Sequence, residues 1–393
     1  MKQKIMLLGW CINAALLLTQ CNTAENVAED TVAKPDLSYK IIGYVAGWRA
    51  NFQQQVIDAE KLTHINYAFA NVADGKVVEG SERDADNFTT LRALKEKNPH
   101  LKILISVGGW SWSENFSDAA LTDSSRAVFA HSAVEFMKRH QLDGVDIDWE
   151  YPGLPGEDNV YRPEDKENFT LMLKALREEL DALGAADGRE GNDKYLLTIA
   201  TGAQDEFLTT TNLGEAQQYL DCINIMTYDF YTGGAPVTGF HTNLNLSVHD
   251  DARRRSAIQS VQGHLDAGVS PGKIVLGVAF YGRGWTDVHD ENNGLFQTVN
   301  GEGVSFPYGT LSKDYIDKNG FVRYWDESAQ APYLWNAETK TFISYDDVES
   351  LTHKAAFIKS KGLGGVMFWE YSQDTEGELL NILFTQLLPS DEM

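Results

Sequence analysis

The sequence has few cysteines, few basic residues and no long hydrophobic segment in its main part. Three cysteines occur among 393 residues, so a scaffold held together by disulfides is excluded. Lys and Arg number 33 against 57 Asp and Glu, and the net charge of −24 argues against binding to a nucleic-acid backbone, which relies on basic side chains. After the N-terminal region no run approaches about eighteen apolar residues, so no later membrane-spanning helix is predicted.

The N-terminal region has the features of an export signal. A short basic start followed by an apolar run is typical of a secretory signal, which we place at residues 1–20. Residues 21–38 are polar and are predicted to form a tether. The run Leu18–Cys21 resembles a bacterial lipobox, in which Cys21 is acylated, with Gln20 in the place of the usual small residue. We therefore expect an exported protein, either an outer-membrane or cell-surface lipoprotein or a secreted one.

The remaining composition is that of a large globular monomer. Cys11 lies in the predicted signal, and Cys222 follows in an apolar run that predicts a buried thiol. Apolar residues make up 43% of the chain, enough for one large domain or two ordinary ones. The 9 Trp, 16 Tyr and 18 Phe favour stacking on sugars, although large cores also use such rings.

Short apolar runs alternate with helical patterns from residue 40 onward. The runs are rich in Val, Ile and aromatic residues and too short for most helices, so we expect strands. They cover residues 40–48, 62–70, 101–110, 142–150, 195–203, 221–231, 273–285 and 362–371. This alternation predicts an α/β fold, a (β/α)8 TIM barrel over residues 39–388. A doubly wound open sheet is the alternative, but no GxGxxG loop follows the first run.

Three segments between the runs carry helix-boundary signals. Residues 122–140 start with Thr and Asp and end with basic residues, and residues 163–183 have an early Pro and are followed by Gly184 as a stop. Residues 346–361 open with Asp346, which predicts an N-cap. These helices fit between successive strands of a barrel.

The interval between the seventh and eighth runs is longer than one helix and two loops require. Residues 286–342 within it are dense in aromatic side chains. We predict that they form a small inserted α+β subdomain that walls one side of the barrel mouth. A long irregular loop is the alternative.

The segment LDGVDIDWEYP, Leu142–Pro152, places acids at alternate positions of a predicted buried strand. Alternate side chains of a strand share a face, so Asp146, Asp148 and Glu150 point the same way. The opposite face, expected to pack on helices, carries Val145, Ile147 and Trp149. Asp143 starts the strand out of phase, and we expect a supporting role for it.

Three carboxylates about 7 Å apart cannot all be ionised cheaply inside a barrel. At least one must hold a proton near neutral pH, as a general acid does. Glu150 lies at the carboxyl end of the strand, where barrel active sites form, and is the predicted proton donor. Asp146 lies deepest and is expected to share a proton with Asp148.

Salt bridges or a divalent metal are the alternative explanation of the acid row. One strand rarely supplies a complete ligand shell, and no histidine pair at ligand spacing lies nearby. The scattered histidines are read as ordinary core or surface residues, namely His64, His241, His249 and His353. We expect neither a metal nor a cofactor.

The acid row resembles the DxxDxDxE signature of family 18 glycoside hydrolases, the chitinases of bacterial type. Further segments are similar to the family motifs SxGG, MxYD and FYGR, and a tryptophan occupies the expected place on the last strand. These are residues 106–110, 226–229, 280–283 and Trp369. The resemblance covers residues 40–385, including the insertion, which is similar to the chitinase insertion domain.

The resemblance implies a retaining, substrate-assisted mechanism on chitin or chito-oligosaccharides. In that scheme Glu150 protonates the leaving oxygen, and the N-acetyl group of the substrate attacks the anomeric carbon. Asp148 orients the acetamido nitrogen, and Asp146 tunes Asp148. Tyr228 hydrogen-bonds the acetyl carbonyl oxygen.

The resemblance also implies the sugar-binding residues. Trp369 would floor the site of the sugar to be cleaved, and Trp110 would stack on the acceptor-side sugar. Other matched positions that line the acetyl pocket or contact the sugar are Tyr44, Phe69, Met226, Asp229, Tyr281 and Arg283.

Two other functions stay open at this point. A chitin-binding lectin shares the fold, but family lectins typically lack the acid that Glu150 provides here. An endo-N-acetylglucosaminidase of the same family, acting on N-glycans or peptidoglycan, is the second alternative. Tyr228 and the insertion favour chitin.

Overall fold

The computed structural model describes residues 39–49, 56–251 and 255–388, which belong to one structural unit. The predicted signal, the tether and Cys21 lie outside these residues. Within the described part, none of the helices has the length and apolar character needed to cross a membrane.

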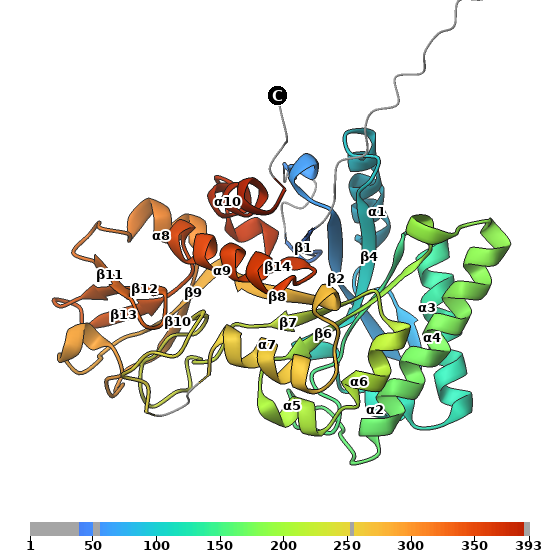
Figure 1. Cartoon of the computed structure of the whole chain (residues 1–393), viewed down its shortest axis with the longest axis horizontal. Coiled ribbons are helices and arrows are strands. Elements are labelled where there is room, and N and C mark those ends of the chain that lie inside the picture. The colour runs from blue at the N-terminus through green and yellow to red at the C-terminus, as the bar shows by residue number, and fades with distance from the viewer. Residues whose placement is uncertain (1–38, 50–55, 252–254, 389–393) are drawn as a thin grey trace, which may run out of the picture. The chain divides into compact units, whose positions relative to one another are not determined.

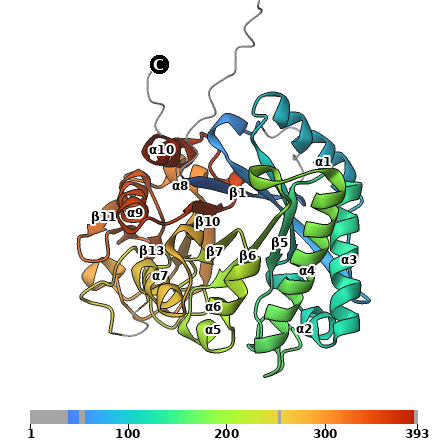
Figure 2. The same cartoon turned by 45° about the vertical axis from the view of Figure 1, so that its right-hand side comes forward.

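Eight parallel strands form a closed barrel, which confirms the predicted (β/α)8 fold (Figures 1 and 2). Each strand overlaps one predicted run. They are β1 (Lys40–Ala46), β2 (His64–Ala73), β4 (Lys102–Gly108), β5 (Gly144–Asp148), β6 (Leu196–Gly202), β7 (Cys222–Met226), β8 (Ile274–Ala279) and β14 (Gly365–Trp369). The barrel closes because β1 pairs with both β2 and β14. The short strand β3 (Lys76–Val78) pairs antiparallel with the end of β2.

Helices lie between the strands and cover the outside of the barrel (Figure 2). They are α1 (Asp84–Ala93), α2 (Phe116–Ala120), α3 (Asp123–Arg139), α4 (Asp165–Asp187), α5 (Asp205–Thr209), α6 (Leu213–Ala216), α7 (Ala257–Asp266), α9 (Val348–Lys361) and α10 (Glu378–Leu387). Thr122 caps α3 through a side-chain hydrogen bond from the backbone N–H of Ser125, as the Thr-Asp start predicts.

Two predicted helix boundaries were wrong. Helix α4 runs through Gly184, which is buried, and ends at Gly188, whose φ of 69° is left-handed, as a C-terminal glycine requires. Helix α9 is capped by Asp347 rather than Asp346, because the Asp347 carboxylate accepts the N–H groups of Glu349 and Ser350. Asp346 instead takes part in a buried ion pair with a lysine of the same helix.

A second, antiparallel sheet follows β8 and lies beside the barrel in Figure 1. It has the order β10-β9-β13-β12-β11. Its strands are β9 (Tyr281–Trp285), β10 (Gly303–Pro307), β11 (Val322–Asp326), β12 (Ala331–Asn336) and β13 (Thr341–Ser344), with α8 (Tyr308–Asp314) between β10 and β11. Only Phe280 separates β8 from β9, so the sheet starts earlier than the expected 286. The apolar run 273–285 contains no sequence feature that would divide one strand from the next.

The two faces of β5 lie as the alternation predicts. Trp149, just beyond the strand, is buried in the layer between strands and helices, where its ring stacks on Phe116 of α2 at a centroid distance of 5.4 Å. It also meets Phe169 of α4 edge-on at 5.7 Å. Asp146 and Asp148 therefore lie on the inner face of the barrel.

Candidate active site

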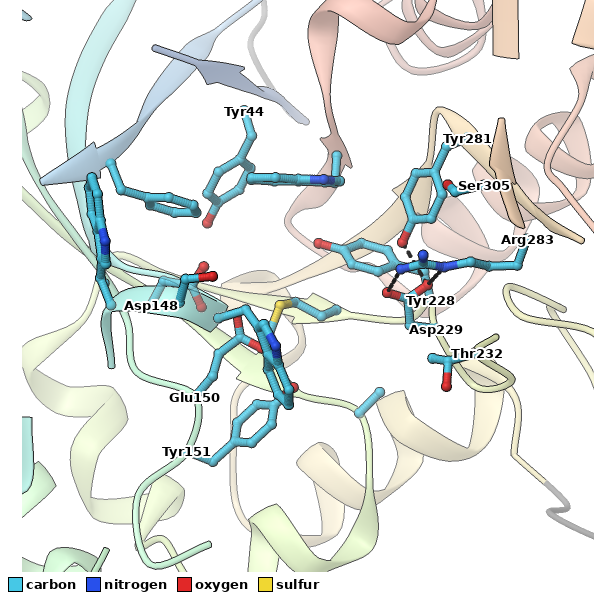
Figure 3. A pocket seen from close by; sticks show the side chains of 18 of the residues that line it. Tyr44, Asp148, Glu150, Tyr151, Tyr228, Asp229, Thr232, Tyr281, Arg283 and Ser305 are labelled. Atoms are coloured by element: carbon cyan, nitrogen blue, oxygen red, sulfur yellow. Dashed lines mark hydrogen bonds and ion pairs between the residues drawn. The ribbon is translucent and has the colours of Figure 1, made fainter. Parts of the chain in front are cut away.

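A cavity of about 1330 Å³ opens at the carboxyl ends of the strands, and Figure 3 shows part of its lining. All but one of the predicted catalytic and sugar-binding residues line it. These are Tyr44, Phe69, Trp110, Asp148, Glu150, Met226, Tyr228, Asp229, Tyr281, Arg283 and Trp369. Asp146 lies below the cavity and is fully buried. The β9–β13 sheet contributes to the wall through Tyr281, Arg283 and Ser305.

Asp146 is held by four donors, one each from β1, β4, β6 and β7. Its Oδ2 accepts from the hydroxyls of Tyr44 and Ser106, each at 2.8 Å. Its Oδ1 accepts from the hydroxyl of Thr198 and the amide of Asn224, the latter at 3.3 Å. Burial raises the pKa of Asp146 above the ordinary value, and the hydrogen bonds oppose that shift. Proton sharing between Asp146 and Asp148 stays a prediction.

Asp148 is the least compensated acid of the row. Its side chain is buried, and its Oδ1 has no hydrogen-bond partner. Burial, followed by the charges of Glu150 and Asp146, raises the pKa of Asp148 well above its ordinary value. A protonated Asp148 can donate a hydrogen bond to a group placed in the cavity.

Glu150 lies two residues beyond the end of β5, and the loop after β4 fixes its backbone. The Glu150 N–H donates to Ser113 Oγ at 2.9 Å, and this hydroxyl in turn donates to the carbonyl of Gly109 at 2.9 Å. Burial raises the pKa of Glu150 to about 7; a hydrogen bond from Tyr151 opposes the shift and the charge of Asp229 adds to it. A carboxyl that titrates near neutral pH suits a general acid.

Asp229, Arg283 and Tyr281 form one hydrogen-bonded group on the opposite wall (Figure 3). The Asp229 carboxylate accepts from Arg283 Nε and Nη2 at 2.8 and 2.7 Å and from the Tyr281 hydroxyl at 2.8 Å. Burial raises the pKa of Asp229, but His241 and Arg283 outweigh it and hold the pKa below its ordinary value. Asp229 is therefore ionised, and its pKa is shifted in the opposite direction to that of Asp148.

His241 belongs to the core behind this group, as expected for an ordinary buried histidine. It is fully buried, and its Nδ1 lies 3.6 Å from Asp229 Oδ1, close enough to act on that carboxylate. Burial lowers the pKa of His241, so the ring is neutral near pH 7. Within the described ranges, no group of three or more His, Cys, Asp or Glu side chains could hold a metal ion.

Tyr228 faces the cavity with a protonated hydroxyl. Burial, followed by the charges of Asp148 and Glu150, raises the pKa of Tyr228 well above its ordinary value. The hydroxyl makes a weak contact of 3.8 Å with the sulfur of Met367 and its ring meets Tyr281 edge-on at 6.2 Å. A phenol that makes so weak a contact is able to donate to a ligand instead.

Aromatic rings from three strands cluster around Trp369. Its ring stacks on Phe69 at 5.6 Å with an interplanar angle of 15°, and lies 5.7 Å from Tyr44. Trp110, on the loop after β4, is 49% exposed and so presents a free face to the cavity. Such rings offer flat surfaces on which the apolar faces of a sugar can stack.

Sequence reasoning missed Trp48, which is 48% exposed and also lines the cavity. A signal was present, because Trp48 follows Tyr44 by four residues and so continues the same face of the first run. It also missed Tyr151, Gln204 and Arg255. These lie in loops, where no periodicity indicates the direction of a side chain.

Comparisons with known proteins agree on one family. The family model described as "Glycosyl hydrolases family 18" matches residues 40–374. Chitinase A1 of Niallia circulans is 44% identical over 413 residues, covering 89% of this chain and 58% of that protein. The chain thus spans less than two thirds of the length of that relative.

Solved structures are similar over most of the described chain. A glycoside hydrolase family 18 N-acetylglucosaminidase from Paenibacillus barengoltzii is 44% identical with a TM-score of 0.82, covering 88% of this chain and 99% of that one. Chitinase ChiA74 from Bacillus thuringiensis is 38% identical with a TM-score of 0.84, covering 90% and 71% respectively.

Proposed function

The chain belongs to family 18 of the glycosyl hydrolases, and from this premise we propose that it is a chitinase that hydrolyses β-1,4 bonds between N-acetylglucosamine units of chitin and chito-oligosaccharides. One observation carries the proposal. Glu150, a buried carboxyl with a pKa of about 7, faces a long cavity with an aromatic floor. The named relatives, among them Chitinase A1, support the substrate class.

In the proposed reaction, Glu150 donates its proton to the glycosidic oxygen as the bond to the anomeric carbon breaks. Glycosidases that use two carboxylates place them on both sides of that bond. Here the second wall offers Asp229, whose carboxylate is engaged by Arg283 and Tyr281. The acetyl oxygen of the substrate then acts as the nucleophile, which gives retention of configuration. Glu150 next takes a proton from water, which opens the oxazolinium ion.

The remaining residues position the acetamido group and the sugar ring. The uncompensated Asp148 carboxyl is placed to bind the acetamido nitrogen, and Tyr228 to donate to the acetyl oxygen. Asp146 supports Asp148 from below. Trp369 provides the floor under the sugar that is cleaved, and Trp110 the platform for the acceptor-side sugar.

The rest of the lining completes the substrate site. Tyr44 and Phe69 close the acetyl pocket, and Met226 of β7 packs on the same cluster of apolar side chains inside the barrel. Asp229, Tyr281 and Arg283 form the polar wall, whose charges are already paired. That wall suits a neutral, hydroxyl-rich substrate because no free charge there demands a counter-ion.

A second candidate is an N-acetylglucosaminidase. The specific observation in its favour is the family 18 relative of that name, 44% identical to this chain over almost all of its own length. Both activities cleave beside an N-acetylglucosamine unit and use the same acid. A lectin is less well supported, because Glu150 is retained and its pKa lies in the range that catalysis requires.

Digestion of chitin pentamer and hexamer tests the proposal. Early proton NMR spectra should show new reducing ends as the β anomer, because the mechanism retains configuration. Oligosaccharide products indicate a chitinase, and N-acetylglucosamine alone indicates the second candidate. Binding without any product would leave a lectin and would overturn the hydrolase.

We also propose that the protein is exported as a lipoprotein acylated at Cys21, with simple secretion as the alternative. The basis is the sequence alone, since residues 1–38 lie outside the described part. Cell fractionation of the wild type and of Cys21→Ser distinguishes the two. A lipoprotein stays in the membrane fraction only when Cys21 is present, and a secreted protein behaves identically in both cases.

A further inference from the structure

Trp48 extends the aromatic floor beyond Trp369. Its ring stacks on Phe69 at 6.0 Å with an interplanar angle of 22°, and its centroid lies 6.1 Å from that of Trp369. Trp48 is about half exposed, so this side chain has few packing contacts to hold it in one orientation. An exposed ring that binds a sugar loses affinity if it must first be ordered.

The backbone that carries Trp48 passes closely over the barrel. Gly47 precedes it, and a Cβ on this glycine would lie 2.1 Å from the hydroxyl of Tyr67. The Gly47 N–H donates to the carbonyl of Ala68 at 2.8 Å. The chain leaves β1 at a defined point, but these contacts do not fix the Trp48 ring itself.

An ion pair joins the residues that follow the two tryptophans. Arg49 Nη2 and Nε lie 2.7 and 3.2 Å from Glu370 Oε1. Glu370 comes directly after Trp369 on β14, and Arg49 directly after Trp48 near the end of β1. Because β1 and β14 are paired neighbours, the ion pair closes a short loop that contains both tryptophans.

The two partners of this ion pair differ in exposure. The Glu370 side chain is 1% exposed and the Arg49 side chain 43%. Glu370 also accepts from the backbone N–H and the hydroxyl of Ser372, so its orientation is set independently of Arg49. A buried carboxylate with fixed orientation is a strong anchor, because removal of its cationic partner leaves an uncompensated charge.

We propose that the Arg49–Glu370 ion pair is a positioning device that holds Trp48 beside Trp369 and so sets the preference of the enzyme for longer substrates. This inference rests on the proposed function. A substrate that ends before Trp48, as we expect for an aryl chitobioside, gains nothing from the ordering of Trp48. A substrate one sugar longer on the same side reaches Trp48 and gains the stacking contact.

Kinetics on two substrates test the proposal. Wild type and Glu370→Gln are compared on aryl chitobioside and aryl chitotrioside. We expect KM for the chitotrioside to rise about five- to tenfold, KM for the chitobioside to change less than twofold, and kcat to change little on either. In a Trp48→Ala background, Glu370→Gln should add no further change in KM, because the ring that the ion pair orders is gone.

Asp143→Asn is the matched control. Asp143 is also a buried acid with partly exposed basic partners, Lys95 and Arg189, but it lies at the other end of the barrel. It should lower thermal stability without any length-dependent change in KM. If Glu370→Gln does not fold, Arg49→Met removes the exposed partner of the ion pair and tests the same prediction. Arg49→Lys keeps the positive charge and should therefore show part of the chitotrioside affinity that Arg49→Met loses.

The outcomes separate this inference from the proposed function. Equal effects on both substrates, or an unchanged effect in the Trp48→Ala background, would overturn the positioning role while hydrolysis stands. If the wild type hydrolyses neither substrate, the proposed function fails. Tryptophan-fluorescence titrations of the same variants with chitobiose and chitotriose then decide the inference from binding constants alone.

Discussion

The two ends of strand β5 place the same kind of side chain in opposite environments. At the amino end, Asp143 Oδ2 accepts from Lys95 Nζ at 2.5 Å and from the Ile103 N–H at 2.8 Å, and Arg189 lies 3.3 Å from Oδ1. Near the carboxyl end, Asp148 Oδ1 has no partner and burial raises the pKa of Glu150 to about 7. Glu150 lies seven positions after Asp143 in the sequence.

The difference follows from what the neighbouring segments supply. At the amino end, Lys95 and Arg189 and the backbone N–H of Ile103 on β4 meet Asp143, so its charge is paired and stabilises the barrel. At the carboxyl end, aromatic rings surround Asp148, and Asp146 and Glu150 of the same segment lie close to it, so the carboxyls there compete for protons. In this barrel one end of the strand serves stability and the other is left electrostatically strained for chemistry.

The largest effect is expected at the strained end. Glu150→Gln removes the proton donor but keeps the size of the side chain, and hydrolysis of an aryl chitobioside should fall by about 10²- to 10⁴-fold. Binding of chitopentaose, measured by calorimetry, should persist because the aromatic floor is unchanged. Near-normal turnover by this variant would exclude Glu150 as the acid.

At the neutralised end, Asp143→Ala should reduce stability rather than activity. Loss of the carboxylate leaves the Ile103 N–H unpaired and the charges of Lys95 and Arg189 uncompensated, at a cost of about 2–4 kcal/mol. Urea unfolding followed by circular dichroism measures this cost. The kcat per folded molecule should match the wild type. A large fall in kcat would show that Asp143 also serves catalysis, so that the two ends of β5 do not have separate roles.

The smallest expected effect is on stability: Glu150→Gln should stabilise the protein, whereas Asp143→Ala should destabilise it. The pKa of Glu150 in the folded state, about 7, exceeds the ordinary value near 4.5, so ionisation of Glu150 opposes folding. The penalty is absent below about pH 4, grows between the two pKa values and is complete above about pH 7. Glu150→Gln should therefore be more stable than the wild type by about 1–3 kcal/mol at pH 8, and by less at pH 5.

Parallel urea titrations at pH 5 and pH 8 measure this gain. Asp143→Ala at the same two pH values is the control, because the raised pKa of Glu150 is present in both that variant and the wild type. A stability difference for Glu150→Gln that does not change with pH would show that Glu150 is not strained.

The barrel and the acid row were predictable because they depend on local periodicity, whereas Tyr228 and the sugar-binding residues were predicted from the resemblance to the family motifs. Alternation of side chains in LDGVDIDWEYP separated the acids from Val145, Ile147 and Trp149, and the structure places Trp149 between strands and helices. The helix end at Gly188 was not predictable, since Gly184 presents the same local signal. Gly184 is buried inside the helix, whereas Gly188 adopts the left-handed φ that ends it.

The start of the second sheet was missed for a related reason. Tyr281, Gly282 and Arg283 continue an apolar run without a break, yet they pair with β10 and β13 rather than with the barrel. Trp48 was missed because its role depends on the rings from β2 and β14 that meet it. Neither Phe69 nor Trp369 is near Trp48 in the sequence.

By itself, the sequence determined the alternation of strands and helices, the face of β5 that carries the acids and the family motifs, because each depends on residues a few positions apart. Tertiary structure alone decided which carboxyls are neutralised and which are strained. The pairing of Asp143 with basic side chains and the raised pKa values of Asp148 and Glu150 depend on burial and on groups distant in sequence, and those distances exist only once the barrel has closed.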